Sequence, residues 1–245
     1  YEAIADSGYV TKAIDPDNIN FNPERTAIAM GAGLISCDLE EIAPAVAASL
    51  SDKEFDIHKW GKDGLDMITP LWMLKYLPNM LACHIGIIHD IQGPSNTITC
   101  AEASGQLAIA EAAEIIFRGE SDMAVAGGGE SKLNPIVMAR QCLLGRATTE
   151  GNDDPESACR PFDSEAKGSV FGEGAGIVFL EKSEIARKRG AKIYAEIAGL
   201  GQSNNINTNY IHLESEGTGL RIAIEDALED AGISPEQIDL IIPHG

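Results

Sequence analysis

The residue pattern that most clearly suggests chemistry lies in residues 99–112, TCAEASGQLAIAEA. A short apolar run, a tight turn and an amphipathic segment follow one another here, as in a strand that turns sharply into a helix. Enzymes often present a nucleophile at such an elbow, because the N-terminus of the helix stabilises negative charge. The nearest thiol, Cys100, comes two residues too early, and Glu102 stands where the nucleophile is expected. The segment therefore predicts an active-site elbow that carries a carboxylate.

A second candidate is His244, which follows the apolar run 238–242, IDLII. The run predicts a core strand, and open α/β sheets build their sites at the carboxyl ends of such strands. His244 is therefore either a catalytic group or a histidine kept for its hydrogen bonds. The other histidines show no metal-ligand spacing and are expected to be ordinary surface or core residues: His58, His84, His89 and His212.

Three glycine clusters, at 31–33, 127–129 and 172–176, invite comparison with phosphate-binding loops. None is followed by the Lys-Ser/Thr pair of a nucleotide loop, and none has the GxGxxG pattern between a strand and a helix. We expect them instead to let backbones approach closely in a packed sheet or turn.

The charge of the chain excludes one class of partner. Its 245 residues include 18 basic and 38 acidic side chains, a formal net charge of −20. Such a field repels polyanions, so we expect no nucleic-acid partner. The dense basic stretch 187–192, RKRGAK, is expected to complete a helix, where cations complement the helix dipole, or else to dock an acidic protein.

The distribution of apolar and cysteine residues predicts a cytoplasmic protein without a membrane span or signal peptide. Five cysteines are scattered without CxxC or CxxH spacing: Cys37, Cys83, Cys100, Cys142 and Cys159. That pattern argues against a disulfide framework and against structural zinc, and we expect no metal.

Apolar runs alternate with helical patterns, which indicates an α/β protein. Strands are predicted over 26–33, 96–101, 122–129, 175–182, 193–203 and 238–244. Helices are predicted over 104–119 and 218–232, each ending at a glycine. Their expected buried faces are Leu107, Ala110, Ala113 or Glu114 and Phe117 in the first, and Leu220, Ala223, Ile224, Ala227, Leu228 and Ala231 in the second.

An internal duplication is suggested by the segments 3–9, AIADSGY, and 227–233, ALEDAGI. They share an Ala, an Asp and a Gly, and each precedes a polar loop and an apolar run. Both are interpreted as one helix–turn–strand unit used twice. Since the chain begins inside the first unit and stops just after the strand of the second, we expect it to be a fragment of a longer protein.

Three segments in order resemble signature regions of the β-ketoacyl synthases, which elongate acyl chains on acyl carrier protein. They are LPNMLACHIGIIHDIQGPSNTITCAEASG (77–105), RPFDSEAKGSVFGEGAGIVFLEK (160–182) and IDLIIPHG (238–245). The resemblance implies an α/β thiolase-like fold of five layers, α/β/α/β/α, made of two similar halves. Residues 1–205 would form the N-terminal half without its start, and residues 206–245 the beginning of the C-terminal half.

In that family the elbow reads Thr-(Thr/Ala)-Ala-Cys-x-x-Gly. Residues 99–105 match it at Ala101 and Gly105, which places Glu102 in the position of the nucleophilic cysteine. His244 matches the first catalytic histidine, in a His-Gly-Thr motif. The second histidine, its lysine and the Gly-Phe-Gly-Gly loop would lie beyond residue 245.

In the reaction of the family a thiolate takes the acyl chain, and two histidines promote decarboxylation of a malonyl thioester whose carbanion attacks it. A carboxylate is a poor nucleophile toward a thioester, so the resemblance implies a protein deficient in condensation. An ionised Glu102 would repel the malonyl carboxylate, whereas a protonated one would favour decarboxylation. Burial raises the pKa of such a group and the helix dipole lowers it, so both states stay open.

The resemblance thus implies a protein that acts on acyl-carrier-protein thioesters in fatty-acid or polyketide-type biosynthesis, as a partner similar to a chain-length factor. One alternative is a malonyl-thioester decarboxylase or other acyl-thioester enzyme that uses His244. The other is a non-catalytic homodimer that binds acyl chains. No cofactor is implied.

Residues 68–80, ITPLWMLKYLPNM, match the stretch that crosses the dimer interface in the family and closes the acyl tunnel of the neighbour. Trp72 falls where such synthases often carry a gating aromatic, although an aromatic anchor in an interface is an equal alternative. Either role predicts a dimer, with a second copy or with a catalytic ketosynthase.

Overall fold

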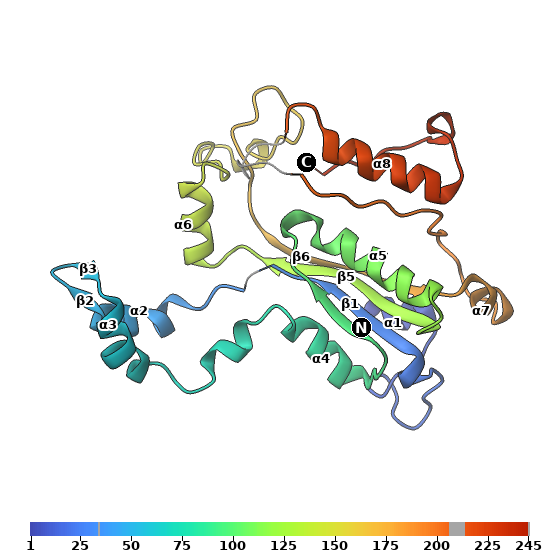
Figure 1. The fold of residues 1–245 in the computed structure, drawn as a ribbon, viewed down its shortest axis with the longest axis horizontal. Coiled ribbons are helices and arrows are strands. Elements are labelled where there is room, and N and C mark those ends of the chain that lie inside the picture. The colour runs from blue at the N-terminus through green and yellow to red at the C-terminus, as the bar shows by residue number, and fades with distance from the viewer. Residues whose placement is uncertain (34, 206–213, 245) are drawn as a thin grey trace.

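The structure is a computed structural model that describes residues 1–33, 35–205 and 214–244. At its centre, among these residues, is a four-stranded sheet in the order β4-β1-β5-β6 (Figure 1). Strand β1 runs parallel to β4 and β5, and β6 is antiparallel to β5. The strands are β1 (Thr26–Gly31), β4 (Ser95–Ile98), β5 (Met123–Ser131) and β6 (Glu173–Glu181). All four coincide closely with predicted strands.

The helices surround this sheet or extend from it. They are α1 (Glu2–Ser7), α2 (Leu39–Ala48), α3 (Ile57–Lys59), α4 (Met80–His89), α5 (Ser104–Phe117), α6 (Pro135–Leu143), α7 (Ser183–Lys188) and α8 (Thr218–Ala231). A small hairpin of β2 (Leu50–Ser51) and β3 (Glu54–Phe55) belongs with α2 and α3 to a lobe that leaves the sheet, at the lower left of Figure 1. No helix of the described residues is long and apolar enough to cross a membrane.

The core forms on both faces of β1, which is buried along its whole length. On one face Ile28 and Met30 pack against Ala82 of α4. The opposite face meets α5 through small side chains, which let the helix lie close to the sheet. That cluster comprises Ala27, Ala29, Ala108, Ala112, Ile115, Ala124 and Ala126. Burial on both faces explains why the strand sequences do not alternate.

The two predicted helices exist, but their predicted buried faces are only partly right. Helix α5 turns Ser104, Ala108, Ala112 and Ile115 inward, whereas Phe117 is 88% exposed. The apolar residues of α5 go round most of its circumference, so spacing alone does not identify the face that meets the sheet. In α8 the alanines face inward, and Leu220 and Ile224 are exposed.

The strands predicted over 193–203 and 238–244 are not formed: neither segment joins a β-ladder with another described segment. A strand requires a neighbour that pairs with its N–H and C=O groups, and residues 199–201 lie against helix α8 instead. A Cβ atom added to Gly199 would lie 2.3 Å from Ala227 O, and one added to Gly201 would lie 1.8 Å from Ala223 O. The Leu200 N–H donates to Asp230 Oδ2 at 2.9 Å.

These contacts define the order of the layers. Helix α4 covers one face of the sheet and α5 the other. Residues 200–202 then lie beside α5, and α8 packs on the far side of 199–201 (Figure 1). The order is that of the α/β/α/β/α arrangement expected from the sequence, with no ladder among the described residues in the fourth layer. The predicted boundary between residues 205 and 206 adjoins residues 206–213, which lie outside the described residues. His212 is one of these residues.

The segments interpreted as a duplicated unit end their helices in the same way. Gly8 follows α1 with φ 79° and Gly232 follows α8 with φ 65°, both in the left-handed conformation that favours glycine. The first unit continues to β1. The second continues through a short 3-10 turn to residues 238–244, which form no ladder in the described part of the chain.

The basic stretch 187–192 completes a helix, as predicted. Arg187 and Lys188 lie in the last turn of α7. Arg187 also pairs with Glu196, and Arg189 pairs with Glu181 at 2.7 Å. These charges are thus compensated within the chain.

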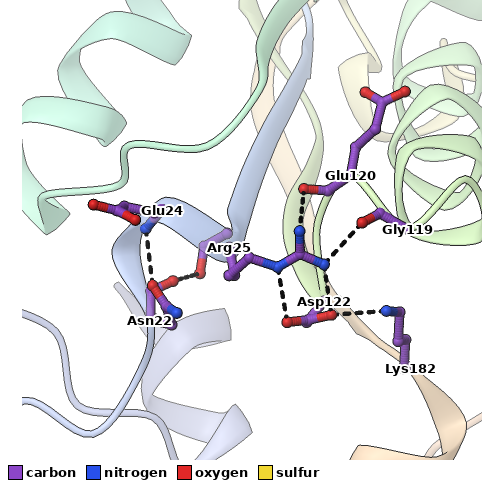
Figure 2. A network of polar contacts seen from close by, with 8 residues as sticks. Asn22, Glu24, Arg25, Gly119, Glu120, Asp122 and Lys182 are labelled. Carbon is purple, nitrogen blue, oxygen red and sulfur yellow. Dashed lines mark hydrogen bonds and ion pairs between the residues drawn. The ribbon is translucent and has the colours of Figure 1, made fainter.

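A polar network fixes the end of the sheet where β1 and β5 begin and β6 ends (Figure 2). The guanidinium group of Arg25 donates to both carboxylate oxygens of Asp122, at 3.0 and 2.9 Å. It also donates to the carbonyl oxygens of Gly119 and Glu120, in the turn after α5. Lys182 Nζ donates to Asp122 Oδ1 at 2.7 Å. The Asp122 carboxylate therefore links three strands, and Arg25 joins them to the end of the helix that packs on them.

Replacing Asp122 with Asn should lower the Tm by roughly 4–8 °C, because it leaves two cations without their shared anion. Hydrogen bonds from Arg25 and then Lys182 hold the pKa of Asp122 well below its usual range. Since the folded-state pKa is the lower one, the stabilisation is complete above the unfolded-state value and is lost as the pH falls below it.

The Tm difference between Asp122→Asn and the unaltered protein should therefore be constant from about pH 7 to about pH 5, and shrink below about pH 4. Thermal unfolding followed by circular dichroism measures it. Asp153→Asn, at an exposed position, is the matched control. A difference that persists unchanged at pH 2 would contradict this account.

Candidate functional site

The predicted elbow lies between β4 and α5. After β4 ends at Ile98, residues Ala101–Ala103 form a 3-10 turn that leads directly into α5 at Ser104. Ala101 has φ 48°, in the left-handed region that residues with a Cβ atom rarely occupy. The chain therefore makes an abrupt change of direction one residue before Glu102.

Ser104 holds this turn in place. Its buried hydroxyl accepts from the Cys100 N–H at 2.8 Å and donates to the Ala101 carbonyl at 2.6 Å. The Ala103 N–H donates to the Cys100 carbonyl at 3.1 Å. The N–H and C=O groups of Cys100, next to the strained Ala101, thus both have hydrogen-bond partners within the turn.

Glycines allow the elbow to rest directly on the sheet. A Cβ atom on Gly31, the last residue of β1, would lie 2.4 Å from the carbonyl carbon of Ser104. One on Gly128 of β5 would lie 3.0 Å from Gly31 O and 3.3 Å from Gly105 Cα. The prediction that clusters 31–33 and 127–129 permit close approach is confirmed at these two positions. In the third cluster, Cβ atoms on Gly172, Gly174 and Gly176 would meet nothing within 4 Å, but the backbone of Gly176 lies close to Gly127, where an added Cβ atom would be 2.1 Å from Gly176 O.

The side chain of Glu102 lies near the N-terminus of α5 and is 42% exposed. Its carboxylate forms an ion pair with the guanidinium group of Arg146, which donates a hydrogen bond to Oε1. Burial by itself would raise the pKa of Glu102. Hydrogen bonds from Arg146 and the backbone, and the charges of Arg146 and His244, outweigh burial, so the pKa is lowered. The carboxyl group is therefore ionised at neutral pH.

The structure brings His244 to the same site. A charge interaction with His244 is the smallest of the contributions that lower the pKa of Glu102, and it places the two side chains within electrostatic reach. His244 is exposed, as is Cys100, which stays on the incoming side of the turn. Glu102 and His244 are thus within electrostatic reach of each other, and their roles in a reaction stay predictions.

Trp72 lies apart from these residues, in a 3-10 turn, Trp72–Tyr76, of the lobe that leaves the sheet. Its ring meets Tyr76 edge to face, with the ring centroids 5.4 Å apart. The Tyr76 hydroxyl donates to Glu41 Oε2 at 2.6 Å. The role of Trp72 in a tunnel or an interface stays a prediction.

Sequence reasoning missed Arg146 and Ser104. Arg146 lies between α6 and β6, far along the chain from Glu102, and belongs to no motif. The only available signal was that a partly buried carboxylate needs a cation, and that does not identify which one. Among the described residues, no group of three or more His, Cys, Asp or Glu side chains is arranged to hold a metal ion.

Comparisons with known proteins show which family the chain resembles in sequence and fold. Residues 1–186 match the family model described as "Beta-ketoacyl synthase, N-terminal domain". A 3-oxoacyl-[acyl-carrier-protein] synthase 2 from Rhizobium meliloti is 37% identical over 244 residues, which cover 99% of the chain and 53% of the relative. The chain spans about half the length of the curated relatives it matches.

Solved structures show the same thiolase-like fold. One is a type II polyketide synthase acyl-carrier protein in complex with its ketosynthase bound to the hexaketide. It has a TM-score of 0.77 and 26% identity, over 96% of this chain and 54% of that one. Another is the ishigamide ketosynthase/chain length factor, with a TM-score of 0.72 and 26% identity, over 96% of this chain and 51% of that one.

The glycine at the end of β1 should be indispensable to the elbow. Gly31→Ala places a methyl group inside the backbone of Ser104, and should destabilise the protein by about 3 kcal/mol or more. Gly172→Ala, where a Cβ atom meets nothing, is the matched control and should change the Tm little. Thermal unfolding measures both. Equal Tm values for the two variants would show that the elbow does not rest on β1 as described.

Proposed function

Because the chain belongs to the β-ketoacyl synthase family, we propose that it acts on acyl-carrier-protein thioesters in fatty-acid or polyketide-type biosynthesis without condensing them itself. The finer proposal is a chain-length-factor-like subunit that partners a catalytic ketosynthase. One observation carries it: the elbow presents Glu102 as an ionised carboxylate paired with Arg146.

The chemistry of that carboxylate excludes the ordinary first step. Acyl transfer to Glu102 would break a thioester and form a mixed anhydride, which is less stable than the thioester and hydrolyses readily. The ion pair with Arg146 also makes the carboxylate a weaker nucleophile, because it stabilises the negative charge on the carboxylate oxygens. Cys100 is an unsuitable substitute, because its backbone N–H is tied to Ser104 on the incoming side of the turn.

The match to the ishigamide ketosynthase/chain length factor supports the partner role, because that solved structure is named for both a ketosynthase and a chain length factor. The match to a ketosynthase in complex with its acyl-carrier protein supports a carrier-protein partner. We also propose that the protein works in the cytoplasm, since all five of its cysteines are free and four are exposed.

A free sheet edge supports a dimer. Among the described residues, β4 has β1 as its only neighbour, so its outer edge is unpaired. On that strand the Thr97 N–H donates to the side chain of Asn96 at 2.8 Å rather than to a neighbouring strand. We propose that this edge, next to the elbow, is where the partner subunit pairs.

A second candidate function rests on His244. An imidazole within electrostatic reach of Glu102 suits an enzyme that removes carbon dioxide from a malonyl thioester, with the imidazole assisting the developing negative charge. Release of carbon dioxide from malonyl carrier protein that is abolished by His244→Ala would favour this candidate over the partner role. The ionised state of Glu102 disfavours it, because like charges repel.

Restoring a thiol at the elbow should restore acyl transfer. The variant Cys100→Ala/Glu102→Cys should gain one acyl group from an acyl-carrier thioester, because Arg146 and the N-terminus of α5 stabilise a thiolate there. Intact-mass spectrometry detects the adduct. The unaltered protein and the Cys100→Ala control should gain none. An adduct on Cys100 of the unaltered protein would refute the proposal, as would a folded double variant that stays unmodified.

The partner role predicts a stable complex with a cysteine-bearing ketosynthase from the same source. Coexpression followed by size-exclusion chromatography should give a one-to-one complex. Thr97→Pro should weaken it by tenfold or more, because proline removes the outward N–H group of β4. Thr97→Val keeps the N–H group and is the control. A complex that tolerates Thr97→Pro would refute pairing at this edge, and isolation of the protein only without such a partner would refute the heterodimer.

A further inference from the structure

Arg146 is held by backbone contacts on both sides, unlike a typical surface arginine. Its N–H donates to the Gln141 carbonyl at 3.0 Å, and its own carbonyl accepts from the Ser169 N–H at 2.7 Å. The Thr148 N–H donates to the Ser169 carbonyl at 3.0 Å, which makes a parallel bridge between Ala147 and Ser169. The backbone of Arg146 is therefore tied to the end of α6 and to the segment that leads into β6.

That bridge depends on Gly168. Its φ is 118°, and a Cβ atom there would lie 2.8 Å from Thr148 N and 3.0 Å from Arg146 O. Only a residue without a side chain lets the two segments approach so closely in this conformation. The chain thus has a specific local structure that supports Arg146.

The backbone of Glu102, the other residue of the ion pair, is fixed as well. Glu102 lies between the left-handed Ala101 and Ser104, whose hydroxyl is bonded on both sides. Most exposed ion pairs contribute little, because two flexible side chains must be ordered to form them. Here the backbones of both residues are fixed beforehand. The arginine side chain is only 33% exposed, so its charge is also partly withdrawn from water.

We propose that Arg146 is a carboxylate-binding residue of this site, and that Glu102 fills the site from within. A guanidinium group binds a carboxylate through a planar set of N–H donors. The free carboxylate of a malonyl-type thioester is the substrate group that would need such a cation at the elbow. Because Glu102 already occupies Arg146, the protein excludes carboxylate-bearing acyl groups from this position.

This inference rests on the proposed function for the placement of the substrate at the elbow, but its consequences are measurable without turnover. Because the Glu102 side chain is 42% exposed, its removal beyond Cβ leaves the guanidinium group of Arg146 without its anion and in contact with solvent. One carboxylate of malonate would then pair with Arg146 in place of Glu102. Arg146 also acts as a positioning residue, since it fixes the charge and orientation of Glu102.

The first test is an NMR titration of the Glu102 side-chain carboxyl, labelled with carbon-13 and assigned with Glu102→Gln. Its pKa should rise by about one pH unit or more in Arg146→Gln. Arg146→Lys keeps the charge and should recover part of the change. Arg160→Gln, which removes an exposed cation paired with Glu165, is the control and should leave the titration of Glu102 unaltered. A titration of Glu102 that is the same in all these proteins overturns the proposal.

The second test uses sodium malonate at constant ionic strength and follows the Tm. Malonate should raise the Tm of Glu102→Ala in a saturable way. It should leave the unaltered protein and Glu102→Ala/Arg146→Gln unchanged. Equal effects on all three proteins, or on none, would overturn the proposal. A failed acylation of the Glu102→Cys variant would leave both results intact, so the two proposals fail separately.

Discussion

The contact on which the rest of the site depends is the backbone-to-backbone packing of the start of α5 on the ends of β1 and β5. Gly31, Gly105 and Gly128 leave no side chain between these elements, so the elbow lies directly on the sheet. This sets the position of the strained turn at Ala101 and the direction in which Glu102 leaves it. It also sets how near Glu102 lies to Arg146. Arg146 comes from a separate segment, which the bridge between Ala147 and Ser169 holds in place. Site geometry is here a consequence of sheet geometry.

Under the proposed function, an ion pair at the expected nucleophile position changes what the same fold can do. A thiolate at a helix N-terminus is stabilised and still reacts with a thioester, whereas a carboxylate paired with Arg146 is stabilised and is a poor nucleophile toward a thioester. Since the fold and the close glycine contacts are present, the proposal that the chain does not condense acyl groups rests on Glu102 and its pairing with Arg146. The surrounding structure accommodates the carboxylate of Glu102 through an arginine whose backbone is independently held.

The sequence was sufficient to predict the four strands of the sheet, the two long helices and their glycine ends, because these follow from local periodicity and capping. It was insufficient where the outcome depends on neighbours. Residues 193–203 and 238–244 have strand-like composition but no pairing partner in the described part of the chain. Helix α5 is apolar on more than one side, so Phe117 was wrongly expected to be buried. At the site, Glu102 and His244 were identified through a resemblance. Arg146 was not, because a contact between distant segments leaves no local pattern.

The two ends of the sheet perform separate tasks. Arg25, Asp122 and Lys182 tie the strands together where β1 and β5 begin, while Glu102 and Arg146 lie where those strands end. About six residues of strand, roughly 20 Å, lie between the two groups, and groups so far apart are energetically independent as a rule. The architecture is therefore modular: a substitution at the elbow should leave the stability supplied by the Arg25–Asp122–Lys182 network unchanged.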